Sequence, residues 1–135
     1  EARLEQARAL GAHVTLLSGE RVPNRVDVVI ETVGEATWKH SMRSLAEGGR
    51  IVVAGSTSGP NPGADLQRLF FRELSVIGAT MGTRDELERL MRFLAVTGIR
   101  PLIDSERPLA EARDAFARMA AGDEFGKLVI TAGGA

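Results

Sequence analysis

The stretch VDVVIE at residues 26–31 runs directly into Thr32, Val33 and Gly34. Only Asp27 interrupts its hydrophobic residues before Glu31 closes it. Near-continuous hydrophobic runs of this length are typical of strands buried on both faces, which occur in parallel sheets covered by helices. This stretch therefore predicts a strand of a parallel sheet, buried on both faces, in an α/β fold.

The residues that follow complete a strand, helix, strand unit. Trp38, Met42 and Leu45 recur at helical spacing, and the glycine pair at 48–49 ends that pattern. Residues 50–54 form the next predicted strand, and a loop rich in glycine and proline covers residues 55–63. A short helix at 65–72 then leads to a third strand of the same kind, Leu74 to Ala79.

The same alternation is predicted on both sides of this unit. Upstream, residues 1–10 have a helical pattern that ends at Gly11, and residues 13–17 (HVTLL) form a short predicted strand before a polar turn. Downstream, Thr83 and Glu86 have the spacing of a capping box. We expect a helix to follow, with Leu87, Leu90, Met91 and Leu94 on one face. After it we expect an extended segment at 99–107 and a helix that ends at Gly122. A strand at 127–131 and a frayed tail at 132–135 would complete the chain.

Strands that alternate with helices in this way predict a doubly wound parallel sheet with right-handed crossovers. Ligands of such sheets bind outside the carboxyl ends of the strands. Here those ends are predicted at residues 31–34, 54–59 and 79–82, which are rich in glycine and small residues. Backbone without bulky side chains lets a flat ligand approach closely.

The composition of the chain narrows the kinds of protein and of binding partner that are expected. With 135 residues and 14.5 kDa, the chain has the length of one domain. Aromatic residues make up only 4%, so we expect an aliphatic core. The 17 basic and 18 acidic residues balance, which favours neither nucleic acid nor an anionic membrane surface as a partner. No apolar run is long enough to cross a bilayer, and no leader is recognisable, so we expect a cytoplasmic protein. Because the helical pattern begins at Glu1 without an initiator Met, we expect a cut within a longer chain.

The sequence lacks the residues or motifs that several kinds of catalytic and binding site require. Cysteine is absent, so thiolate nucleophiles and cysteine-containing zinc sites are excluded. The fingerprint GxGxxG does not occur, and GDEFGK at 122–127 is too short for a phosphate loop and precedes a strand. His13 and His40, the two histidines, have no metal-site or catalytic-triad context.

Four segments together resemble the medium-chain dehydrogenase/reductase superfamily, in particular its zinc-binding alcohol dehydrogenases and quinone oxidoreductases. In order, they are VDVVIETVG at 26–34, LAEGGRIVVAG at 45–55, IGATMGT at 77–83 and GKLVI at 126–130. Each is short, but the four occur in the order and at the spacing of that superfamily.

The resemblance implies a partial Rossmann-like sheet that lacks its first strands and its Gly-rich turn. Residues 1–107 would form the partial nucleotide-binding domain. Residues 108–135 would form a C-terminal return segment that packs on a catalytic domain absent from this chain. Removal of the first strands leaves the strand at 26–31 without one neighbour, which is an aggregation hazard.

The resemblance also implies a set of residues that bind the cofactor, NAD or NADP. Thr32, Val33 and Gly34 would lie near the adenosine half, and Ala54, Gly55 and Ser56 would lie on the nicotinamide side. Ala79 and Met81 would offer backbone groups to the carboxamide. Lys127 would lie near the pyrophosphate. No residue of this chain is predicted to be catalytic or to bind metal. Zinc would belong to the absent part.

The implied activity is hydride transfer between a nicotinamide cofactor and a carbonyl, alcohol, enone or quinone as the small-molecule substrate. We expect the chain alone to be inactive and to bind the cofactor weakly, and we expect a homodimer through the strand at Leu74–Ala79. The alternative is a non-catalytic α/β association module that binds no nucleotide.

Overall fold

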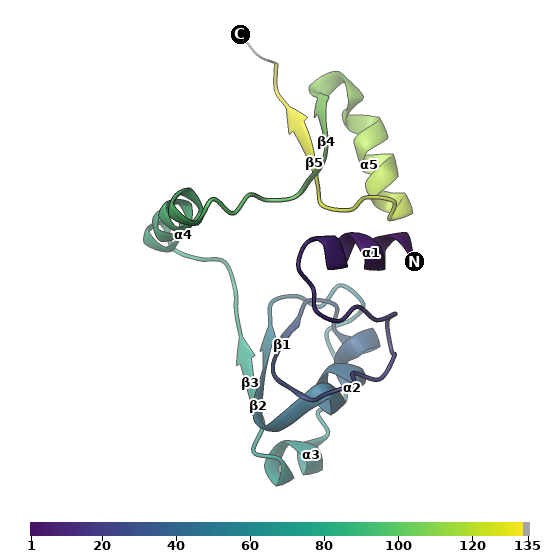
Figure 1. The fold of residues 1–135 in the computed structure, drawn as a ribbon, viewed down its shortest axis with the longest axis vertical. Helices are drawn as coiled ribbons and strands as arrows, with labels where there is room; N and C mark the ends of the chain where they lie inside the picture. Colours follow the sequence, from purple (N-terminus) through teal and green to yellow (C-terminus); the bar gives the residue numbers. More distant parts are fainter. Residues whose placement is uncertain (134–135) are drawn as a thin grey trace. The chain divides into compact units, whose positions relative to one another are not determined.

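A computed structural model describes residues 1–133 of the chain. It divides into two compact units, residues 1–81 and the residues from Gly82 onward. Each unit has its own sheet of parallel strands, as Figure 1 shows. The prediction of an α/β fold with parallel strands is therefore confirmed.

The first unit contains a sheet of three strands in the order β1-β2-β3. These strands are β1 (Val26–Glu31), β2 (Leu45–Val53) and β3 (Ser75–Gly78). Helix α2 (Glu35–Ser44) connects β1 to β2 and packs on both, and helix α3 (Leu66–Phe71) precedes β3. Val28 to Glu31 pair with Arg50 to Val53, and those four residues pair in turn with Ser75 to Gly78. Since both pairings are parallel, all three strands end at the same edge of the sheet (Figure 1).

The core of this unit lies between α2 and β2. Met42, Leu45 and Ile51 are at most 1% exposed, and Trp38 is partly buried against them. Each fully buried aliphatic side chain contributes about 1.5 to 3 kcal/mol. The expected aliphatic core is confirmed, with one correction to its elements. Leu45 is not on the helix: α2 ends at Ser44, and Leu45 has the extended backbone that begins β2.

The strand predicted at residues 13–17 is wrong. After α1 (Ala2–Ala9), Val14 to Leu17 have no ladder partner and no regular secondary structure. The physical reason is pairing: a strand exists only where a neighbour accepts its backbone hydrogen bonds. In the resemblance drawn above, that neighbour is the second strand of the full sheet, which this chain does not contain. The hydrophobic pattern at 13–17 does not show whether a neighbouring strand is present.

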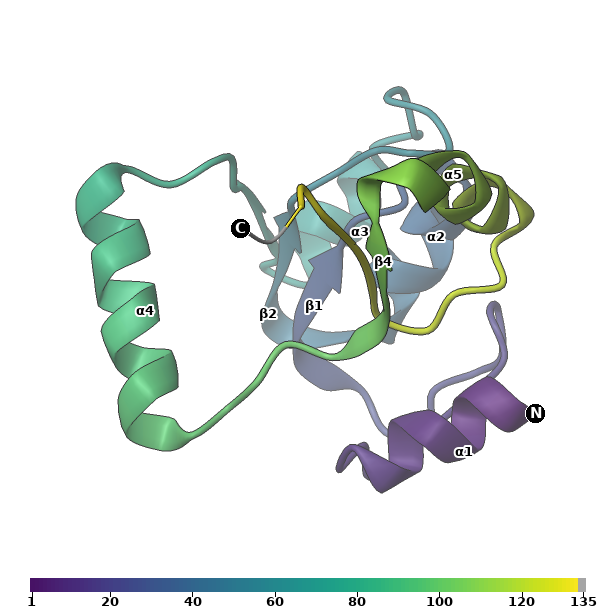
Figure 2. The ribbon, with the colours of Figure 1, turned by 90° about the horizontal axis from the view of Figure 1, so that it is seen from above.

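The second unit begins with helix α4 (Arg84–Thr97), which has the predicted capping box of Thr83 and Glu86. Strand β4 (Ile103–Pro108) pairs in parallel with β5 (Lys127–Thr131). Helix α5 (Ala112–Ala121) packs against both strands, with Ala115 only 2% exposed, and Figures 1 and 2 show it beside β4. The functional boundary predicted between residues 107 and 108 falls within β4 and stays a prediction.

The end of helix α5 follows the sequence pattern. Gly122 ends α5 with a left-handed backbone, at a φ of 69°. Residues 134 and 135, part of the tail predicted to fray, lie outside the described residues. None of the helices within residues 1–133 has the length and apolar character needed to cross a membrane.

Candidate functional site: the carboxyl edge of the first sheet

The candidate site is the edge at which β1, β2 and β3 end. The segment after β2 stays attached to β1, because the Ala54 amide donates to the Glu31 carbonyl at 2.8 Å. In the same way the Ala79 amide donates to the Val53 carbonyl at 2.9 Å, so the segment after β3 stays attached to β2. Eight of the nine predicted cofactor residues, all except Lys127, therefore follow adjacent strands at one edge.

A buried carboxylate organises the loop after β1. The Glu31 side chain closes that strand, and the residue is only 3% exposed. Its Oε1 accepts from the amides of Val33 and Gly34 at 2.8 and 3.0 Å and from the Thr37 hydroxyl at 2.7 Å. Its Oε2 accepts from the Ser41 hydroxyl at 2.5 Å. One side chain therefore connects the loop to the first turns of α2.

These hydrogen bonds keep Glu31 ionised. Burial by itself raises the pKa of a carboxyl group, because it penalises the charged form. The hydroxyls of Ser41 and Thr37 and the amides of Gly34 and Val33 outweigh that effect, and together they lower the pKa of Glu31 from 4.5 to about 2. Glu31 is thus a fixed negative charge at neutral pH, and all of its described bonds are to groups of its own chain.

The loop after β1 packs directly on the loop after β2. The Ser58 amide and hydroxyl both donate to the Val33 carbonyl at 2.7 Å, and the Ala36 amide donates to the same hydroxyl at 3.0 Å. The Glu35 amide donates to the Gly59 carbonyl at 3.2 Å. Hydrogen bonds therefore hold the two loops together at the ends of β1 and β2.

Two glycines of this edge lie against backbone of the same chain. A Cβ on Gly34 would collide with the Gly59 carbonyl and lie 3.0 Å from Ser56 Cα, and a Cβ on Gly55 would lie 2.8 Å from the Thr32 carbonyl. The missing side chains therefore admit neighbouring backbone of the same chain. At Gly78, by contrast, an added Cβ would meet nothing within 4 Å, so the backbone at the end of β3 is open.

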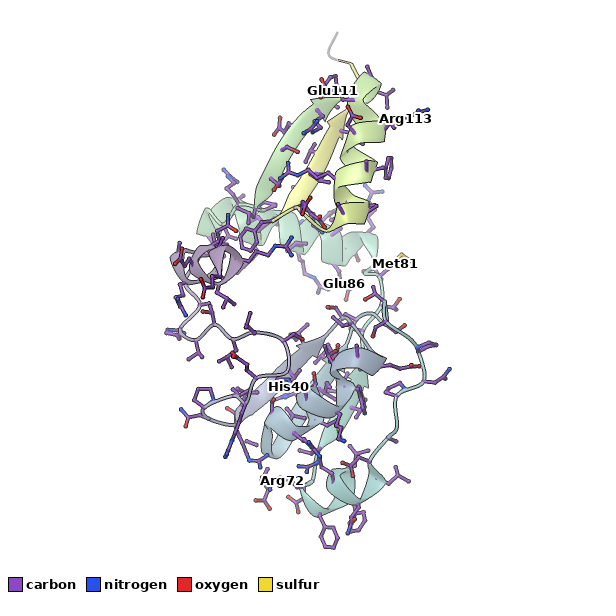
Figure 3. The ribbon with its side chains drawn as sticks, turned by 90° about the vertical axis from the view of Figure 1, so that its right-hand side faces the viewer. His40, Arg72, Met81, Glu86, Glu111 and Arg113 are labelled. Carbon is purple, nitrogen blue, oxygen red and sulfur yellow. The ribbon has the colours of Figure 1, made fainter. Side chains whose placement is uncertain are left out.

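The predicted residues differ in what they offer a ligand. Thr32, Ala54 and Ser56 are exposed, whereas Gly34 is buried. The Ala79 amide is already donated to Val53, so only its carbonyl is left for a ligand. Met81, labelled in Figure 3, is 92% exposed and, among the described residues, makes no hydrogen bond.

Lys127 belongs to the second unit. It is exposed at the start of β5, and its amide donates to the Leu102 carbonyl at 2.8 Å. Gly126 before it has a φ of 118°, and an added Cβ there would lie 2.6 Å from the Leu102 carbonyl. The glycine thus fits the backbone of this turn closely, and the Lys127 ammonium group stays in solvent.

The sequence analysis missed the role of Glu31. It named the residue only as the end of a strand, yet the Glu31 side chain connects the loop after β1 to the first turns of α2. The available signal was an acidic residue at the end of a strand predicted to be buried on both faces. Such a position is costly for a charge unless hydrogen bonds satisfy it.

The residues of this chain do not fit a zinc site. Within residues 1–133 no three His, Asp or Glu side chains gather closely enough to hold a metal ion, and the sequence has no cysteine. We therefore derive no step through zinc. The edge does fit part of a flat coenzyme, because small exposed residues follow all three strands.

Comparison with known proteins identifies the family. The profile of the family described as zinc-binding dehydrogenase matches residues 5–130. The chain is 29% identical over 116 residues to an acryloyl-coenzyme A reductase of Metallosphaera sedula, covering 84% of this chain and 35% of that protein. A thermostable alcohol dehydrogenase of Pyrobaculum aerophilum, solved with cobalt and zinc, is 32% identical with a TM-score of 0.85, covering 97% of this chain and 40% of the other.

A third similar structure carries ligands. It is the 2-octenoyl-CoA carboxylase reductase CinF in complex with NADP and 2-octenoyl-CoA, 26% identical with a TM-score of 0.72, covering 77% of this chain and 23% of that one. The chain thus spans less than half the length of each of these relatives. On the match over residues 5–130 and the shared Rossmann-like fold, the chain belongs to the zinc-binding dehydrogenase family of the medium-chain dehydrogenase/reductase superfamily.

Proposed function

We propose that this chain provides one side of the nicotinamide cofactor site of an NAD(P)-dependent oxidoreductase. The observation that carries the proposal is the common edge at which β1, β2 and β3 end, with exposed small residues after each strand. In open parallel sheets such an edge is where dinucleotides bind. Membership of the dehydrogenase family and the NADP bound to CinF support the same assignment.

The cofactor supplies hydride transfer to or from a carbonyl, an alcohol or an activated alkene such as an enone or quinone. The chain's own residues position it. Thr32 and Val33 would lie beside the adenosine half, Ala54 and Ser56 beside the nicotinamide, and the Ala79 carbonyl would accept from the carboxamide. Gly34 and Gly55 support these residues by letting the two loops pack together.

We also propose that the Lys127 ammonium group approaches the cofactor pyrophosphate. A compact cation on a flexible side chain can reach a phosphate as a point charge. Substitution K127M keeps much of the apolar stem and removes the charge. It should weaken binding of NADPH and leave binding of free nicotinamide mononucleotide less affected, because only the dinucleotide has a pyrophosphate.

The affinity of this chain alone should be low. Dinucleotide-binding folds hold the pyrophosphate at the amino terminus of the helix after a Gly-rich turn, and the sequence has no such fingerprint. We expect a calorimetric titration to give a dissociation constant no tighter than about 1 mM for NADH and for NADPH. We also expect no NADPH oxidation by the chain with any quinone. Micromolar affinity or measurable turnover would overturn this part of the proposal.

Association is the second candidate function, favoured by the position of β3. This strand is an edge of the first sheet, and its Val76 and Ile77 are 47% and 44% exposed. Unpaired edge strands are ready to pair with a second chain. We propose a homodimer through Leu74–Ala79. If the chain dimerises but neither NADH nor NADPH binds at millimolar concentration, the alternative of a non-catalytic association module is favoured.

A further inference from the structure

We propose a second ligand site, at the opposite end of the first sheet, that binds a small multiply charged oxyanion. A cavity of about 400 Å³ lies there, which is within the size range of small-molecule pockets. It is formed by the turn after α1, the carboxyl end of α2 and α3. Its lining residues include Arg21, Arg25, His40, Arg43, Ser44 and Arg68.

The charge of this cavity differs from that of the whole chain. Four arginines and one histidine line it, and no carboxylate does, although the chain has 18 acidic against 17 basic residues. Like charges gathered on one small surface repel one another. A cavity lined in this way therefore favours an anionic occupant.

Two of the four arginines form the walls of the cavity. The Arg25 guanidinium donates to the carbonyls of Arg43 and Leu45 at 2.8 and 3.1 Å, which ties the turn to the end of α2. Arg68 pairs with Asp65 at 3.2 Å. His40, labelled on α2 in Figure 3, donates through Nε2 to the Glu20 carbonyl at 2.7 Å and holds the other side of the turn. The cavity is thus built by bonds within the chain.

The other two arginines have nothing to bind within the described chain. Neither the Arg21 nor the Arg43 guanidinium makes an ion pair or hydrogen bond to any of residues 1–133. The carboxylates of the two neighbouring segments are already engaged: Glu20 accepts from the Leu17 amide at 2.9 Å, and Asp65 holds Arg68. Arg21 and Arg43 come from separate segments and line one cavity, so both can contact one ligand.

Arginine pairs determine the chemistry of the ligand. A guanidinium group donates two parallel hydrogen bonds to phosphate or carboxylate oxygens. The ligand should therefore carry at least two negative charges on phosphate or carboxylate groups close together. This site is separate from the proposed cofactor edge: it lies beside Ser44, where β2 begins, whereas that edge follows Val53. Val26 pairs with Leu45 and Glu31 pairs with Val53, so five residue steps along β1 place the two sites roughly 17 Å apart.

The test is calorimetric titration of the chain with inorganic pyrophosphate and, in a second arm, with citrate, at constant ionic strength. We expect binding in at least one arm, and the stronger arm identifies phosphate or carboxylate as the preferred group. R21A and R43A should each weaken that binding about tenfold. The matched control is R113A, which removes an exposed arginine from α5 in the second unit (Figure 3) and should change binding less than about twofold.

Trp38 provides the folding control, since it is the only tryptophan and packs against the core of the first unit. Its fluorescence should be the same in R21A, R43A and the unsubstituted chain. Absence of binding in both arms by a chain with native Trp38 fluorescence would overturn the proposal. An equal loss of affinity in R113A would also overturn it, since that result indicates attraction to the overall charge and no site.

Discussion

Glu31 is the residue on which the geometry of the proposed cofactor edge depends most directly. It is a buried charge with four hydrogen-bond donors, two of which are amides of the loop that would face the cofactor. Buried charges without partners are very costly, whereas fully bonded ones fix the groups around them. We therefore treat Glu31 as a positioning residue, which acts on the cofactor through the loop.

Substitution E31Q should destabilise the first unit by about 2 to 3 kcal/mol at neutral pH. The amide group of Gln would face groups that are themselves donors, so at least one bond is lost and one donor is left unpaired. The measurement is denaturant unfolding followed by Trp38 fluorescence. The control is E47Q, which changes an exposed carboxylate in β2 and should alter stability by less than about 0.5 kcal/mol. Equal stability of the two variants would contradict this role.

The pH dependence of stability follows from the same group. The pKa of Glu31 is about 2 in the folded chain against 4.5 ordinarily. Its contribution, on the order of 3 kcal/mol, is therefore complete above about pH 4.5 and is lost as the pH falls toward 2. The stability difference between the unsubstituted chain and E31Q should shrink over that interval. A difference that stays constant from pH 6 to about pH 2 would show that the charge of Glu31 contributes nothing.

The residue scale also shows what the sequence pattern could predict. Glycines and small residues at strand ends were predicted to let a ligand approach the backbone closely, and at Gly34 and Gly55 neighbouring backbone of the same chain lies that close. The partner in that approach was not predictable, because Gly34 and Gly55 contact loops distant in the sequence, at Ser56 to Gly59 and at Thr32. A glycine indicates that a Cβ does not fit, but it does not indicate whether ligand or chain fills the space.

At the scale of elements, the packing of the loops after β1 and β2 is the feature to test. G34A places a methyl group against the Gly59 carbonyl in a residue whose φ is 95°. We expect a loss of at least about 2 kcal/mol from the strained backbone and the collision together. G63A is the matched control, since Gly63 has no heavy atom within 4 Å of an added Cβ. Thermal unfolding of both variants measures the difference, and a G34A chain as stable as G63A would contradict the packing described here.

Helix α4 depends on its cap more than on burial. Within it no residue is buried, while the Glu86 carboxylate accepts from the Thr83 amide at 2.6 Å and the Glu86 amide donates to the Thr83 hydroxyl at 3.3 Å. T83A should therefore speed hydrogen exchange of the first amides of α4 about fivefold. T57A, in an exposed loop position, should leave them unchanged. Unaltered exchange in T83A would show that the cap does not hold the helix.

The elements also separate what sequence predicts well from what it does not. The capping box and the glycine that ends α5 are local signals, and both were predicted correctly. The hydrophobic run at 26–31 was predicted correctly as a strand, but its predicted burial on both faces was wrong, because β1 lies at the edge of the sheet with Val28 and Ile30 44% and 65% exposed. The segment 13–17 has an equally good strand pattern but no partner in this chain, so it forms no strand. Leu45 was assigned to the wrong element, although its burial was predicted, since both a helix and a strand would place it in the core.

At the scale of the whole molecule, the exposed edge of β3 leads us to expect a homodimer. If the edge strand pairs with a second copy, light scattering should give a mass of twice 14.5 kDa at high concentration. The dimer should dissociate on dilution, because a single short strand buries little surface. A mass of 14.5 kDa at every concentration would exclude pairing through Leu74–Ala79.

The central claim is that the ends of β1, β2 and β3 together bind a nicotinamide cofactor, and amide chemical-shift mapping tests it most directly. The titration adds NADH and, separately, NADPH to the R43A chain, so that the basic cavity contributes less. The account predicts shifts concentrated at residues 32–34, 54–56 and 79–81 that grow through the millimolar range. Shifts confined to other residues, or none at these three segments, would contradict it.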